Sequence, residues 1–178
     1  MLITVKTYPT LFKEAKDKQF GTSLAVLKPK EVIDFIWEPC EREWDPKKIA
    51  KIIANKAQGS LFDVEETESI FKVVKQIPYK FSYVFTTEDQ IKKTLMIEDW
   101  ELGALYWKCL KDAEGDEKIA CQKVKEKYLD YMCNKRDLYF FMGTTFKFHN
   151  VSPNPFLIIG TFYPPKEDPK KIIQPQLF

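Results

Sequence analysis

The sequence predicts an α+β fold, a mostly antiparallel sheet or partly open β-barrel of about six to seven strands with two to three helices packed on it. Strand-like segments occur at both ends of the chain and in its middle. The two clearest helical segments follow one another instead of alternating with strands. Of the 178 residues, 44% are hydrophobic and 15% are aromatic, enough for a substantial core.

The first part of the chain is expected to supply strands and one short helix. Pro9 is expected to end the first strand, and the charged residues 11–18 fit a loop or a short helix. Asp45 and Pro46 predict a helix start, because Asp caps a helix N-terminus and Pro suits the first helical position. The three predicted strands are residues 2–8, 22–27 and 31–38.

The middle of the chain contains the clearest strand, residues 79–86, in which aromatic side chains recur at every second position. Residues 71–76 predict a preceding strand that Pro78 interrupts. Residues 88–90 are expected to form a hairpin turn, and residues 94–97 the return strand.

Two amphipathic helices are predicted next, and two strands after them. The first helix begins near Glu98 and Asp99, and the second has Asp116 as its N-cap. Helical spacing assigns the buried face of the second helix to Cys121, Val124, Tyr128 and Tyr131. The later strands, residues 137–148 and 155–163, each contain a glycine that permits a bulge.

These elements predict one domain at residues 1–163, followed by an extended tail at residues 164–178. Residues 56–69 are acidic and polar and are expected to form a linker within the domain. The tail carries four prolines in 15 residues, which disfavours helices and sheets.

Composition excludes several classes of protein. The 28 basic and 26 acidic residues give a net charge of +2, which does not indicate a general nucleic-acid binder. The four cysteines form no CxxC pair, so neither a structural zinc site nor another cofactor is expected. No apolar stretch approaches the roughly 18 residues of a membrane span, and no signal peptide is apparent. We therefore expect a cytoplasmic protein, and its Lys, Glu and Ile content is typical of a thermophile.

Several segments together resemble an uncharacterised family of archaeal and bacterial proteins. The resemblance covers roughly residues 71–165, and it extends to the opening segment ITVKTYPT. It implies no activity, and therefore no functional residue. The segments that carry it are IPYKFSYVF, IEDWELGALYW, KVKEKY, DLYFFMGTT and IIGTFYPP.

A short pattern, Gln-x-x-Leu-Phe, occurs twice in segments expected to be exposed. Composition alone predicts roughly 0.04 such matches in this chain. The pattern resembles the peptides that dock on DNA sliding clamps, in which Gln enters a polar pocket while Leu and Phe fill an apolar one. The matching residues are Gln58, Leu61 and Phe62 in one copy and Gln174, Leu177 and Phe178 in the other.

The first functional hypothesis is therefore a non-enzymatic accessory protein of DNA metabolism that docks on a larger partner, the sliding clamp. In the alternative interpretation of the two patterns, Leu61–Phe62 and Leu177–Phe178 simply pack on the protein's own core. The sequence does not predict an oligomeric state.

The second hypothesis is a metal-dependent enzyme that acts on nucleic acid. Converging carboxylates hold Mg²⁺ for phosphoryl chemistry, although helix capping and solvation explain these acids more simply. His149 is a further candidate as a general base, since its charge changes near neutral pH. The candidate carboxylates are Glu38, Glu98, Asp99 and Asp137.

The third hypothesis is a β-rich module that binds nucleic acid. Aromatic rings on a sheet stack bases, and lysines contact phosphates. The strand period equally predicts that these rings lie in the core. The candidate residues are Tyr79, Lys80, Tyr83, Lys92 and Lys93.

Overall fold

A computed structural model describes residues 7–17, 21–47, 49–50, 75–145, 152 and 154–166. The chain divides into two compact units: Met1–Trp37 together with Phe81–Phe178, and Glu38–Lys80. The predicted boundaries of domain, linker and tail remain predictions.

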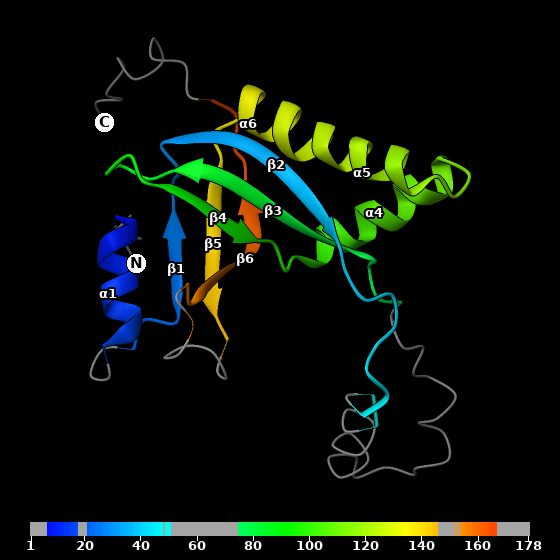
Figure 1. Ribbon diagram of the computed structural model, residues 1–178. Helices are drawn as coiled ribbons and strands as arrows, with labels where there is room; N and C mark the ends of the chain where they lie inside the picture. Colours follow the sequence, from blue (N-terminus) through cyan, green and yellow to red (C-terminus); the bar gives the residue numbers. More distant parts are fainter. Residues whose placement is uncertain are drawn as a thin grey trace, which may run out of the picture. The chain divides into compact units, whose positions relative to one another are not determined.

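The α+β class predicted from the sequence is confirmed. In the described residues the strands form two three-stranded sheets, which do not close into a barrel (Figure 1). One sheet has the order β1-β5-β6 and the other the order β2-β3-β4. The strands are β1 (Leu24–Leu27), β2 (Glu31–Pro39), β3 (Tyr79–Thr86), β4 (Lys92–Met96), β5 (Tyr139–Thr144) and β6 (Phe156–Phe162).

The chain begins differently from the prediction. Tyr8 opens helix α1 (Tyr8–Lys16) instead of ending a strand, and Pro9 lies in the first turn of that helix. Proline is well tolerated there, because the first N–H groups of a helix have no intrahelical partner. The rest of the predicted first strand, residues 2–6, lies outside the described residues.

Two helical segments follow the hairpin of β3 and β4 (Figure 1). Asp99 and Asp116 cap them, because each side chain accepts a hydrogen bond from a backbone N–H two or three residues later. The segments are α4 (Trp100–Asp112) and the continuous run of α5 (Glu117–Lys125), π-helix η1 (Glu126–Tyr131) and α6 (Met132–Lys135).

One predicted core residue is wrong, and the π-helical turn is the reason. A π-turn accommodates an extra residue and so rotates the later residues of the helix about its axis. Cys121, Val124 and Tyr128 are buried as predicted, but the next buried side chain is Met132, while Tyr131 is only half-buried. The α-helical period misses this shift of one residue.

Aromatic side chains join the two sheets and the second helical segment into one core. The rings of Phe35 on β2 and Tyr83 on β3 lie 5.2 Å apart, and Phe35 lies 5.3 Å from Tyr128. Phe140 on β5 stacks on Tyr83 at 5.0 Å and meets Phe85 edge-on at 5.2 Å. The inner face of the β1-β5-β6 sheet thus packs on β3.

A bulge interrupts the pairing of β5 and β6. Phe141 pairs with Gly160 and Met142 with Ile158, so Ile159 is an extra residue on β6. Before the bulge, Phe156 and Ile158 are buried; after it, Phe162 is 51% exposed. Because side chains alternate between the two faces of a strand, the bulge turns Phe162 to the outer face of the sheet.

The smaller unit, residues 38–80, contains the predicted helix start. Asp45 accepts a hydrogen bond from the Lys47 N–H at 2.9 Å, and its backbone carbonyl accepts one from Ile49 at 3.1 Å. In the same unit, the Cys40 N–H donates to the carbonyl of Pro78 at 2.9 Å.

None of the helices among the described residues has both the length and the apolar character needed to cross a membrane.

Candidate functional site

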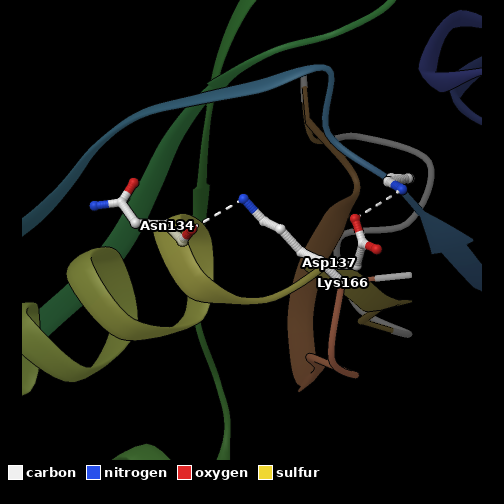
Figure 2. Close-up of polar contacts among 4 residues, drawn as sticks. Asn134, Asp137 and Lys166 are labelled. Atoms are coloured by element: carbon white, nitrogen blue, oxygen red, sulfur yellow. Dashed lines mark hydrogen bonds and ion pairs between the residues drawn. The ribbon is translucent and has the colours of Figure 1, made fainter. Parts of the chain in front are cut away.

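The last described residues lie beside the segment that leads into β5, just beyond the paired residues Tyr139 and Phe162. The Asp137 N–H donates to the carbonyl of Pro164 at 3.0 Å, and Arg136 forms an antiparallel bridge with Pro165. The Lys166 ammonium donates to the carbonyl of Asn134 at 2.9 Å, as Figure 2 shows. The backbone is therefore held in place up to residue 166, the last residue before the segment 167–178.

Cationic side chains and tyrosine rings contact one another near these last described residues. The Lys127 ammonium lies 4.0 Å from the centroid of the Tyr131 ring and 5.4 Å from that of Tyr163. Lys127 and Tyr131 are four residues apart on one helical segment, a spacing at which side chains meet. The Arg136 guanidinium donates to the Tyr131 hydroxyl at 2.8 Å. We name Lys127, Tyr131, Arg136, Tyr163 and Lys166 the exit cluster.

The exit cluster carries positive charge that no carboxylate of the described residues pairs with. Within the described part of the chain, Lys127, Arg136 and Lys166 form no ion pair with an acidic side chain. Cation–π contacts hold ammonium and guanidinium groups in position without cancelling their charge. This surface is therefore suited to an anionic ligand.

A neighbouring lysine is paired. The Lys28 ammonium lies 3.1 Å from Asp137 and 5.0 Å from the Tyr139 ring centroid. The hydrogen bond to Asp137 raises the pKa of Lys28, and burial opposes this effect only in part. Lys28 therefore remains a cation at neutral pH.

The residues of both Gln-x-x-Leu-Phe copies lie outside the described residues. This applies to Gln58, Leu61 and Phe62 as well as to Gln174, Leu177 and Phe178. Their role in partner binding stays a prediction. His149 also lies outside the described residues.

Tyr83 does not lie on a surface that nucleic acid could reach, which corrects its predicted role. It is fully buried, and its hydroxyl donates to the carbonyl of Tyr128 at 2.8 Å. Burial holds the pKa of Tyr83 well above its ordinary value. This agrees with the core interpretation of the alternating strand.

The other residues predicted to bind nucleic acid have mixed surroundings. Lys80 and Lys92 are exposed, and Tyr79 is half-buried. Lys93 is also half-buried, and its ammonium lies 5.3 Å from the Tyr8 ring centroid. With Tyr83 in the core, this face loses one of its two stacking rings.

The candidate carboxylates differ in their surroundings. Asp99 caps α4 by accepting from the Glu101 N–H at 2.9 Å, and burial raises its pKa. Asp137 pairs with Lys28, and Glu38 is exposed. Across the described residues, no group of three or more His, Cys, Asp or Glu side chains is placed to hold a metal ion.

The cysteines of the helices are poor nucleophiles. Burial raises the pKa of Cys121 and of Cys133 to about 12 and raises that of Cys109 as well. The thiolate is the reactive form of cysteine, so these three thiols stay protonated and unreactive at neutral pH. Cys109 and Cys121 are buried and fill space in the core.

Comparison with known proteins assigns a family. The sequence profile described as "Domain of unknown function (DUF8757)" matches residues 4–178, almost the whole chain. The chain belongs to this family. The DUF8757 description names no activity, in agreement with the uncharacterised family that the sequence resembles. A search of the curated proteins and a search of the solved structures each found no match.

The exit cluster is not predictable from the sequence patterns. Helical spacing assigns Tyr131 to the buried face of a regular helix, whereas in the structure it lies in the π-helical turn and is half-buried. Tyr163 and Arg136 both contact the Tyr131 ring, and the bridge between Arg136 and Pro165 pairs segments that are distant in sequence. The spacing of Lys127 and Tyr131 is the one local signal in the sequence.

Proposed function

We propose that this protein is a non-enzymatic accessory protein of DNA metabolism that docks on a DNA sliding clamp through residues 174–178. The observation that carries the proposal is the repeated Gln-x-x-Leu-Phe pattern, for which composition predicts roughly 0.04 matches. Gln174 supplies the polar contact, while Leu177 and Phe178 supply a compact apolar anchor.

The contacts of the exit cluster in the folded structure also support this proposal. Contacts of Arg136, Asp137 and Lys166 fix the chain at residues 164–166. Seven residues separate Lys166 from Gln174, and fully extended they reach about 25 Å. A partner that engages the peptide would therefore be held close to this cationic surface.

The two alternative functions have less support. The metal-dependent enzyme requires converging carboxylates, and Asp99 and Asp137 are each engaged in other contacts. The nucleic-acid module built on β3 requires Tyr83 at the surface, and that ring is buried. None of these contacts argues against the docking hypothesis.

The test is calorimetric titration of the full chain into the sliding clamp of its host. We expect binding that weakens at least about tenfold in Leu177→Ala/Phe178→Ala, because the two apolar anchors are lost. The matched control is Leu61→Ala/Phe62→Ala, which removes the same side chains from the internal copy.

Each outcome has a defined meaning. Loss of binding only in the Leu177/Phe178 variant assigns docking to residues 174–178. Loss only in the Leu61/Phe62 variant moves it to the internal copy and contradicts the proposal as stated. A full chain that does not bind the clamp removes the proposal altogether.

A further inference from the structure

The outer face of the β1-β5-β6 sheet carries exposed aromatic rings. On β5, the side chains of Phe140 and Met142 are buried, as is Leu138 just before the strand, while Phe141, between Phe140 and Met142, is 40% exposed. Phe162, turned outward by the bulge, is 51% exposed. Its ring lies 6.0 Å from Tyr139 and 6.3 Å from Phe141. These three rings form an aromatic strip across β5 and β6.

Aliphatic side chains extend the strip toward β1. A Cβ atom added at Gly143 would lie 3.2 Å from the Ile159 side chain and 3.7 Å from that of Leu24. Ile159 and Leu24 thus cover Gly143, and they are 44% and 69% exposed. The outer face is therefore an apolar surface continuous across the three strands.

One end of the aromatic strip is positively charged. Lys28 lies over the Tyr139 ring, and Arg136 and Lys166 lie where the chain continues past Tyr139 and Phe162. Lys28 pairs with Asp137. Among the described residues, Arg136 and Lys166 form no ion pair with a carboxylate, so the surface combines exposed rings with two unpaired cations.

We propose that this outer face binds single-stranded DNA. Unpaired bases would stack on Tyr139, Phe162 and Phe141, and phosphates would contact the cations at the end of the strip, Lys28, Arg136 and Lys166. Exposed aromatic side chains on a sheet are a stacking platform for unpaired bases, whose flat faces are hidden in a duplex.

The charge of the strip's end argues for this ligand. Phosphates are anionic, and each cation that contacts one releases bound counterions from the strand. The choice of DNA over RNA rests on the proposed function in DNA metabolism, whereas the surface itself is independent of residues 174–178.

The first test is fluorescence anisotropy of a labelled oligothymidylate of about 20 nucleotides at low salt. We expect the full chain to bind, and Phe141→Ala/Phe162→Ala to bind at least about tenfold more weakly because stacking is lost. The matched control is Ile119→Ala, which removes a similarly exposed apolar side chain from α5 and should bind like wild type. Circular dichroism checks that each variant is folded.

The second test measures the phosphate contacts and does not depend on removing rings. Lys166→Ala should lower the slope of log affinity against log salt by about 0.7, the value for one phosphate contact to a single strand. A chain without residues 174–178 should bind the oligonucleotide like the full chain. The same deletion should abolish clamp binding, so that failure of either proposal is distinguishable from failure of the other.

Results of three kinds would overturn the inference. One is a folded full chain that does not bind oligothymidylate at low salt, or an aromatic variant that binds it like wild type. Another is a dimer in sedimentation velocity that the aromatic variant dissociates, which would assign the face to a second copy of the chain. The third is tenfold tighter binding of the matching RNA, which would overturn the assignment to DNA.

Discussion

Asp34 on β2 illustrates how a single side chain ties a helix to a sheet. Its carboxylate accepts hydrogen bonds from the Lys125 ammonium at 2.6 Å and from the Phe35 N–H at 2.7 Å. The bond to Lys125 is the main reason why the pKa of Asp34 lies below its ordinary value of 3.8, although burial opposes the shift. The Lys125 ammonium also lies 6.0 Å from the Trp37 ring centroid.

We predict that Asp34→Asn removes a pH-dependent part of the stability. A carboxylate with a lowered pKa stabilises the folded state above its unfolded pKa, and this contribution is lost as pH falls through the folded value. The variant should be less stable than wild type by about 0.2–1 kcal/mol near neutral pH, because the pair is only partly buried and solvent screens it. The measurement is urea denaturation near pH 7 and again near pH 2.5, where the difference should vanish.

The control for this prediction is Glu31→Gln, which neutralises an exposed carboxylate on the same strand. It should leave the stability within about 0.5 kcal/mol of wild type at either pH. An Asp34 variant whose deficit is the same at both pH values would show that the side chain contributes by packing and not by its charge.

At the scale of the element, the helical run from Glu117 to Lys135 separates what local sequence predicts from what it does not. The sequence predicts Asp116 as its N-cap because a short polar side chain precedes an apolar period, and the Asp116 carboxylate accepts from the Ile119 N–H at 3.0 Å. The π-turn is not visible in the same pattern. Its effect, the burial of Met132 in place of Tyr131, depends on tertiary packing around the turn.

We predict that Asp116→Ala lowers the free energy of unfolding by about 1 kcal/mol, because the Ile119 N–H loses its side-chain partner at the helix start. Asp116→Asn should stay close to wild type, since the amide oxygen accepts the same hydrogen bond. Chemical denaturation of the three proteins under one set of conditions measures both differences. Equal losses in the two variants would trace the effect to charge and not to capping.

At the scale of the whole molecule, the α+β class was predictable, and the arrangement of the described strands was not. The alternation in residues 79–86 identifies β3 from local sequence alone. The order β1-β5-β6 pairs segments separated by more than a hundred residues, such as Leu24 with Gly143, and no local pattern encodes that choice. The exit cluster escaped prediction for the same reason, because it combines a helix with the ends of two distant strands.

We predict opposite sensitivities for two neighbouring phenylalanines on β5. Phe140 joins the sheets by packing on Tyr83 and Phe85, so Phe140→Ala should cost about 3–5 kcal/mol of stability. Phe141 lies on the outer face, and Phe141→Ala should cost about 1 kcal/mol or less. Urea denaturation followed by circular dichroism provides the comparison. Similar losses in the two variants would mean that the outer face is covered in solution.

The extra residue, Ile159, shifts the alternation of side chains between the two faces of β6 by one position. If β6 kept this residue but had no bulge, the alternation that buries Phe156 and Ile158 would also turn Gly160 and Phe162 inward and place Thr161 and Tyr163 outside. A relative of this chain that lacks one residue at this point would instead form a regular strand and keep Gly160, Thr161 and Phe162 on the faces that they have here. In an alignment of this family, a gap at position 159 therefore marks the loss of the bulge without a change of surface.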